Sequence, residues 1–144
     1  VTPTGFGNPR RMTNGIDVNR VLLLIAVLEK RARMNLSNSD IYVNVAGGLR
    51  IDETAVDLGI CAAVATSQAD IPLPPDMIFI GEVGLGGELR GVSQLEKRIN
   101  EAAKLGFKSA IVPKQSLRGV KIPDGFAAYG IKTISEMINM LRRK

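Results

Sequence analysis

One stretch, RIDETAVDLGICAAVATS at residues 50–67, constrains the fold of this chain more than any other. It opens with three acids in eight residues and then becomes almost entirely apolar. The pattern predicts a helix from about Thr54 to Ser67. The stretch has the build of an active-site helix, yet no nucleophilic side chain lies where catalysis would require one. Whether the segment is catalytic therefore depends on the residues that the rest of the chain brings to it.

Strands and helices alternate along the chain, which indicates an α+β or α/β sandwich. Prolines break any helix in the loop 69–76, and residues 77–92 read as a strand, a glycine-rich turn and a second strand. We expect further strands at 39–48, ending at Gly47 and Gly48, and at 108–113 and 126–131, and further helices at 17–33, 93–106 and 133–144.

Two of the expected helices carry end signals. Asp17 is a candidate N-cap for the first, and Ser93 for the third, where Glu96 would complete a capping box and Gly106 marks the stop. The apolar faces comprise Val21, Leu22, Ile25 and Leu28 in the first helix, and Leu95, Ile99, Ala102 and Ala103 in the third. The last turn of the first helix carries Lys30, Arg31 and Arg33, which suit the helix dipole.

Histidine and cysteine counts exclude several kinds of chemistry. The chain has no histidine, which removes histidine general bases and Ser-His-Asp triads. A single cysteine, Cys61, excludes an internal disulfide and, without histidine, a standard zinc site. Because Cys61 lies within an apolar run, we expect a buried side chain rather than a reactive thiol.

The glycine-rich segment GLGGELRG (84–91) is a candidate phosphate loop, because it contains four glycines in eight residues. A phosphate loop would need a lysine followed by serine or threonine at the start of a helix. This segment lacks that lysine and leads into an expected strand, so it predicts a tight hairpin. The glycines at 46–48 likewise indicate a turn rather than a dinucleotide fingerprint.

The net charge of +5 permits a polyanionic partner without requiring one. The basic runs at 9–11, 29–33 and 142–144 are either solvated ends of elements or contacts to an anion, where arginine makes bidentate phosphate contacts. Aromatic residues make up only 4% of the chain, so a stacking platform for single strands is poorly supported.

The chain has no apolar run near the ~18 residues that cross a bilayer, and its first residues lack the apolar core of a signal peptide. Because it begins with Val1 and not methionine, we expect an excised domain. Residues 1–16, rich in Gly, Pro, Asn and Arg, are expected to form an irregular arm before a domain at 17–144.

Two segments together resemble the proteolytic domain of Lon proteases. GEVGLGGELRGVSQLEKRINEAAKLGF (81–107) matches the Lon phrase Gly-Glu-x-x-Leu-x-Gly and the helix that carries the partner lysine. DETAVDLGICAAVATS (52–67) matches, in position and helix character, the Gly-Pro-Ser-Ala-Gly element that presents the serine. With NPRR (8–11) and NVAGGLRIDETAVDLGI (44–60), the similarity narrows to the C-terminal Lon-like domain of the RadA/Sms family and covers nearly the whole chain.

The resemblance implies an α+β fold, a two-layer sandwich of the ribosomal protein S5 domain 2-like kind. RadA/Sms proteins are similar to RecA-type ATPases with an N-terminal zinc module, and they act in recombinational DNA repair by promoting branch migration. Since this chain has no Walker motif and no zinc cysteines, ATP, Mg and Zn are implied for the missing N-terminal part and no cofactor is expected here. The resemblance also implies a hexameric ring and a bacterial cytoplasmic location, or an organelle if the source is a plant.

The Lon serine corresponds to Ala55 and the Lon lysine to Arg98. Ala55 has no nucleophilic atom, and Arg98 stays protonated and cannot accept a proton from a hydroxyl. Both halves of a Ser-Lys mechanism are therefore absent. Thr54 and Lys97 are each one residue away, but adjacent helical residues point roughly 100° apart.

Acids surround the expected nucleophile position. Glu53 and Asp57 fall where the protease has the first and last glycines of its element, and carboxylates there would oppose a developing oxyanion. At a helix N-terminus, by contrast, Asp52, Glu53 and Asp57 favour the dipole, so we expect them to stabilise the start of the helix.

These observations leave three hypotheses. The first is a non-proteolytic domain of a DNA repair ATPase that binds single-stranded or branched DNA and builds a ring, without membrane contact. The second is a residual peptidase that uses Thr54 with Lys97, and the third is an oligomerisation scaffold without DNA contact. For the first, DNA should avoid the acids and contact basic residues in loops and at element ends, namely Arg10, Arg11, Arg50, Arg90, Lys97 and Arg98.

Overall fold

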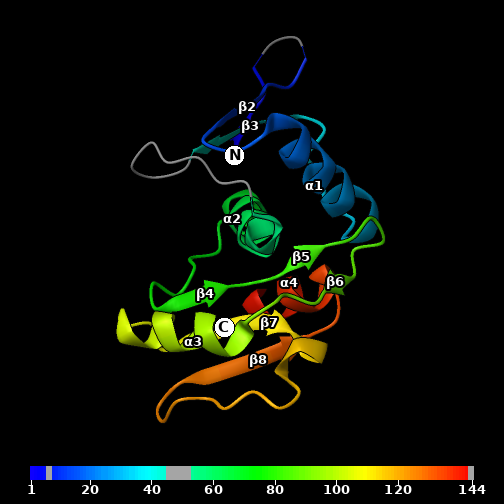
Figure 1. The fold of residues 1–144 in the computed structure, drawn as a ribbon. Helices are drawn as coiled ribbons and strands as arrows, with labels where there is room; N and C mark the ends of the chain where they lie inside the picture. The colour runs from blue at the N-terminus through cyan, green and yellow to red at the C-terminus, as the bar shows by residue number, and fades with distance from the viewer. Residues whose placement is uncertain (6–7, 45–52, 143–144) are drawn as a thin grey trace.

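The structure is a computed structural model, and it describes residues 1–5, 8–44 and 53–142 (Figure 1). Within these residues the chain forms four α-helices, two short 3₁₀ helices and three small sheets. The fold class is therefore α+β, as the alternation of strands and helices predicts. No helix in the described part of the chain has the length and apolarity needed to span a membrane.

A small sheet near the N-terminus has the strand order β1-β3-β2, built from β1 (Thr2–Pro3), β2 (Arg11–Asn14) and β3 (Ser39–Asn44). β1 pairs with β3 antiparallel and β2 pairs with it parallel. The expectation of an irregular arm at 1–16 is corrected here, because β1 and β2 are strands. Their pairing partner lies further along the chain, so no local pattern marks them. The expected end of β3 at 47–48 lies outside the described residues.

Helix α1 (Val18–Arg31) begins where the sequence predicts, since the Asp17 side chain accepts the Asn19 N–H at 3.1 Å. The expected apolar face is wrong at one position, because Leu22 is 42% exposed. The helix is rotated so that Leu24 and Val27 are buried in its place. It also ends before Arg33, which follows in a left-handed conformation at φ 55°.

The apolar stretch forms the centre of the molecule. It starts as the 3₁₀ helix η2 (Thr54–Val56) and continues as α2 (Asp57–Ala69), which confirms the predicted helix. Figure 1 shows α2 between the sheet that contains β2 and β3 and the layer formed by β4 (Met77–Phe79), β7 (Ser109–Pro113) and β8 (Ala127–Ile131). Leu58, Cys61 and Ala62 are fully buried there. An apolar helix suits this place, because other elements pack against several of its sides.

A second sheet is parallel, with the order β4-β7-β8. Between β4 and α3 the glycine-rich segment forms the antiparallel β5–β6 hairpin, which confirms the predicted turn. Gly84 donates to the Glu88 carbonyl at 2.9 Å across it. The elements of this half are β4 (Met77–Phe79), β5 (Glu82–Val83), β6 (Leu89–Arg90), α3 (Leu95–Lys104), β7 (Ser109–Pro113), η3 (Lys114–Leu117), β8 (Ala127–Ile131) and α4 (Ile134–Arg142).

The predicted capping box of α3 is wrong. The N-cap is Gln94, in a left-handed conformation, and no side chain caps the helix. Glu96 instead accepts the backbone N–H of Lys121 at 2.8 Å, and the Ser93 carbonyl accepts from Arg98 Nε at 2.9 Å. Glu96 is therefore engaged by a residue 25 positions later in the chain and not by the start of α3. The predicted stop is confirmed, since Gly106 follows the helix at φ +98°.

Candidate functional site

Ala55 and Arg98, the positions that the resemblance assigns to the Lon dyad, lie on neighbouring elements. Ala55 in η2 is 8% exposed and belongs to the same buried cluster as Leu95 and Ile99 of α3. The backbone fixes this arrangement, because the Gly81 N–H donates to the Ala55 carbonyl at 2.8 Å and the Leu58 N–H donates to the Gly81 carbonyl at 3.0 Å. The segment between β4 and β5 therefore aligns the start of α2 with α3.

Arg98 is already engaged at this site. Its guanidinium forms an ion pair with Glu53, two residues before Ala55, and its Nε donates to the Ser93 carbonyl. An arginine with these partners serves as a fixed cation and cannot act as a general base. Glu53, at the N-cap position of η2, is thus held by a tertiary contact with α3, and its expected effect on the helix dipole stays a prediction.

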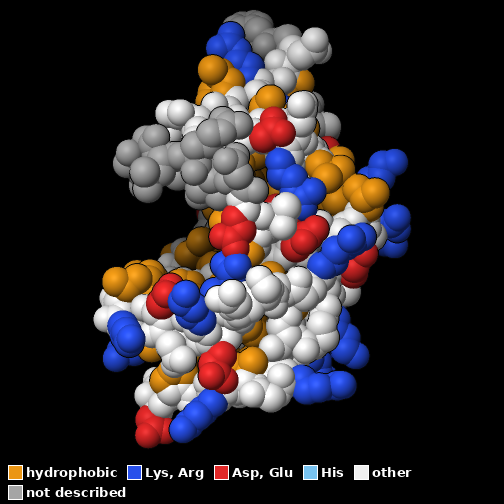
Figure 2. All heavy atoms as spheres, in the orientation of Figure 1, with side chains coloured by type: hydrophobic (Ala, Val, Ile, Leu, Met, Phe, Trp, Pro, Cys, Tyr) orange, Lys and Arg blue, Asp and Glu red, His pale blue; other side chains and the backbone are white. Residues whose placement is uncertain are grey.

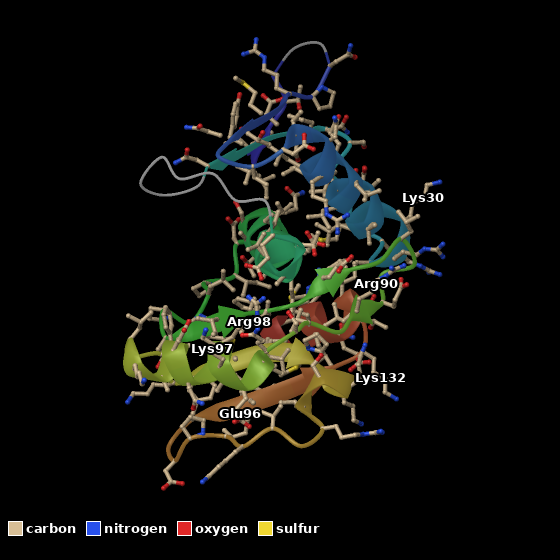
Figure 3. All side chains as sticks on the ribbon, viewed as in Figure 1. Lys30, Arg90, Glu96, Lys97, Arg98 and Lys132 are labelled. Carbon is tan, nitrogen blue, oxygen red and sulfur yellow. The ribbon has the colours of Figure 1, made fainter. Side chains whose placement is uncertain are left out.

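The substitute residues Thr54 and Lys97 have different partners. The Thr54 hydroxyl donates to Glu82 Oε2 at 3.2 Å. Lys97 is exposed on α3 beside Arg98 (Figure 3), and within the described residues it forms neither a hydrogen bond nor an ion pair. The hydroxyl of Thr54 is therefore directed to a carboxylate, and no contact joins it to Lys97 among the residues that the structure describes.

Asp57 lies in the first turn of α2, as the sequence predicts, but the sequence did not indicate its burial or its partners. Its side chain is fully buried, where it accepts Arg20 Nε at 3.0 Å and the Val83 N–H at 3.1 Å. The hydrogen bond to Asp57 raises the pKa of Arg20. The carboxylate therefore lies at the helix start, as expected, and in addition joins three elements. No local signal marks Arg20, which lies 37 residues earlier. Asp52 lies outside the described residues.

The six predicted DNA contacts do not form one cluster. Arg11 donates to the carbonyls of Ser39 and Leu36, so its guanidinium supports the end of the first sheet. Arg10 is exposed beside it, and Arg50 lies outside the described residues. Arg90 is exposed on β6 with Glu88 4.0 Å away. Figure 3 shows Arg90 well apart from the pair Lys97 and Arg98 on α3.

Two further groups have perturbed pKa values. Burial raises the pKa of the Cys61 thiol to about 12, which confirms a buried cysteine. The backbone N–H of Arg10 donates to Asp40 at 2.8 Å and lowers the pKa of that carboxyl, and the Thr4 hydroxyl contributes in the same direction. No cluster of three or more His, Cys, Asp or Glu side chains that could hold a metal ion occurs among the described residues.

Comparison with known proteins connects this chain to two names. A family model described as subunit ChlI of Mg-chelatase matches residues 19–116, which is more than half of the chain. Proteins named DNA repair protein RadA from Streptococcus pyogenes serotype M1, Halalkalibacterium halodurans and Bacillus subtilis are 50%, 51% and 52% identical to it. The alignments cover 96%, 97% and 96% of this chain, and 31%, 31% and 30% of the relatives.

The chain belongs to the family that the ChlI model describes. The predicted resemblance to the RadA family is also confirmed, because about half of the residues are identical to those of the RadA proteins over nearly the whole chain. The chain spans about a third of the length of the curated relatives it matches.

Proposed function

We propose that this chain is a non-proteolytic Lon-like domain that contributes to DNA binding and ring assembly in a RadA-type DNA repair protein. The observation that supports it most directly is the ion pair between Arg98 and Glu53 beside Ala55. A cation committed to a carboxylate stands where a proton acceptor would be needed, and a methyl group stands where a nucleophile would be needed. We infer the S5 domain 2-like classification from the same resemblance.

The relatives' name supports the DNA repair role, and the net charge of +5 is compatible with a polyanion. In this proposal branch migration, with ATP, Mg and Zn, belongs to parts of a RadA-type protein other than this chain. The domain contributes surface to a homo-oligomer, a hexameric ring, in the bacterial cytoplasm.

The peptidase question has a direct test. The unmodified chain and Thr54→Ala are incubated with fluorescent casein. We expect no turnover from either, because the Thr54 hydroxyl is hydrogen-bonded to the Glu82 carboxylate and not to Lys97, the partner that the residual peptidase would require. Turnover that disappears in Thr54→Ala would establish the residual peptidase instead.

DNA binding is tested by salt titration. Anisotropy of a labelled DNA fork is measured with the chain over a range of salt concentrations. Contacts to phosphates release counterions, so the logarithm of the affinity should fall linearly with the logarithm of salt concentration. Absence of binding, or binding without this slope, would favour a scaffold that has no electrostatic contact with DNA. The mass of the chain by light scattering then reports the oligomer.

A further inference from the structure

Basic residues that were not predicted as contacts surround a hollow beside η3. It has a volume of about 660 Å³ and is lined by Lys114, Gln115, Leu117, Arg118 and Lys132. Three of these five residues are cationic, and no acid is among them. Lys114, Arg118 and Lys132 are all exposed, and none of them forms an ion pair with a described residue. Their charges are therefore free to meet an anion.

The hollow is rigidly built. Gly130 of β8 lies directly under η3, since a Cβ at Gly130 would come within 2.9 Å of Leu117 Cδ1 and 3.1 Å of Lys114 Cα. On the other side, Gln115 Nε2 donates to the Leu89 carbonyl at 3.0 Å, and the Val92 N–H donates to Ser116 Oγ at 3.1 Å. The backbone that carries Lys114 and Arg118 is thus fixed before any ligand arrives, which reduces the entropic cost of binding.

Further basic residues lie between the hollow and α1. The Leu89 N–H donates to the Lys132 carbonyl at 2.8 Å, which places Arg90 next to the hollow. Gly87 approaches Arg31 so closely that a Cβ there would lie 2.9 Å from Arg31 Cβ. Figure 3 shows Lys30, Arg90 and Lys132 following one another along one side of the molecule. We call this surface the basic edge; it comprises Lys30, Arg31, Arg90, Lys114, Arg118 and Lys132.

The basic edge carries few acids. Figure 2 shows blue side chains along the margin of the molecule from α1 to the lower sheet. Among the described residues, the acid that forms an ion pair with a cation of the basic edge is Glu88, whose Oε2 lies 4.0 Å from Arg90 Nε. By contrast, Arg98 is neutralised by Glu53, and Arg11 is occupied by backbone carbonyls. Two of the predicted contacts, Arg98 and Arg11, are therefore already engaged, whereas Lys114, Arg118 and Lys132 form no ion pair with a described residue.

We propose that the basic edge, centred on the hollow between η3 and the end of β8, is the phosphate-binding surface of this domain for nucleic acid. The proposal rests on the proposed DNA-binding function and gives it a location. A run of cations across α1, the β5–β6 hairpin and η3 suits a ligand with many phosphates in a row, because each contact releases a counterion. Sequence-independent backbone contacts need no aromatic platform, which this chain of 4% aromatic residues lacks.

The test compares two triple variants with equal loss of charge. The first is Lys114→Gln with Arg118→Gln and Lys132→Gln, and the second is Lys104→Gln with Lys108→Gln and Lys121→Gln, three exposed lysines outside the basic edge. Binding to a fluorescein-labelled DNA fork is measured by anisotropy over a salt series, and circular dichroism melts verify that both fold. We expect the first variant to lose affinity by about tenfold or more and to reduce the salt slope by about one per lost phosphate contact. The second should bind nearly as the unmodified chain does.

Each other outcome has a defined meaning. If the unmodified chain binds and both variants lose affinity equally, or the first loses none, the basic edge is wrong while DNA binding stands. If the unmodified chain does not bind, the proposed function fails and this inference with it. Full DNA binding by the first variant, together with loss of its binding of inorganic phosphate, would assign the hollow to a free anion and would overturn the proposal.

Discussion

Arg20 of α1 and Asp57 at the start of α2 form an ion pair in which the Asp57 side chain is 1% exposed. The same carboxylate accepts the Val83 N–H at 3.1 Å, and Arg20 reaches the Val83 carbonyl at 3.4 Å. The pair thus joins α1, α2 and β5 around the start of the central helix. A buried pair of this kind is costly to break, because one partner is left charged and unpaired.

We therefore expect Asp57→Asn to destabilise the fold by about 3 kcal/mol, near the lower end for breaking a buried pair, because Arg20 is partly exposed. Urea unfolding followed by circular dichroism measures the loss. Asp124→Asn, at an exposed loop position, serves as the matched control and should change little. An Asp57→Asn midpoint equal to that of the control would show that the pair does not hold these elements together.

Acid should weaken the first sheet through Asp40. The Arg10 backbone N–H lowers the pKa of this carboxyl in the folded state. Its stabilising contribution is therefore present above the unfolded pKa and is lost as pH falls through the lowered folded pKa. The stability difference between the unmodified chain and Asp40→Asn should shrink over that acidic range, measured as urea midpoints against pH. Arg10→Ala keeps the backbone N–H that donates to Asp40, so this variant should retain most of the pH dependence of stability. If Arg10→Ala loses that pH dependence, the Arg10 guanidinium and not the backbone N–H lowers the pKa of Asp40.

Cys61 should be inert in the folded chain. It is fully buried, and burial raises the pKa of its thiol to about 12, so almost no thiolate exists at neutral pH. A thiol reagent such as dithionitrobenzoate should react only as fast as the chain opens, and at once in denaturant. Reaction in native buffer at the rate of a free thiol would contradict the packing of α2.

Local patterns predicted most of the elements. The central helix, the β5–β6 hairpin and strands β7 and β8 each carry a continuous apolar or turn signal within a few residues. Asp17 also capped α1 as expected, since its partner lies two positions away. These features depend on neighbours in sequence, so the sequence alone is sufficient to find them.

The features that sequence reasoning missed depend on distant partners. Glu96 had the right spacing for a capping box, but it accepts the N–H of Lys121 instead. The same holds at the candidate site. The resemblance assigned Ala55 and Arg98 to the two dyad positions, but it could not predict the ion pair that Arg98 makes with Glu53. Asp57 was correctly placed at the helix start, but its ion pair with Arg20 was not predicted. Periodicity and spacing carry no information about such pairs.

The β5–β6 turn should depend on Gly87. This glycine has φ +80°, and a Cβ there would lie 2.9 Å from Arg31 Cβ. Gly87→Ala should lower the free energy of unfolding by more than the roughly 1–2 kcal/mol that a left-handed backbone costs a non-glycine residue. Gly119→Ala is the matched control, since Gly119 has φ +75° with open space around it. Equal losses of stability in thermal or urea unfolding would mean that the contact with α1 adds nothing.

Restoring the nucleophile should not restore proteolysis. Ala55→Ser places a hydroxyl at the position that the resemblance assigns to the Lon serine, but Arg98 remains protonated and paired with Glu53, so the lysine that would accept the proton is absent. We expect no casein turnover from Ala55→Ser.

The triple variant Ala55→Ser with Arg98→Lys and Glu53→Gly is the control for this prediction, because it also supplies a lysine and removes the carboxylate that would pair with that lysine. Turnover in the triple variant and none in the single variant would identify Arg98 and Glu53 as the barrier. Turnover in Ala55→Ser alone would show that the ion pair does not prevent catalysis and would contradict the non-proteolytic assignment of this site.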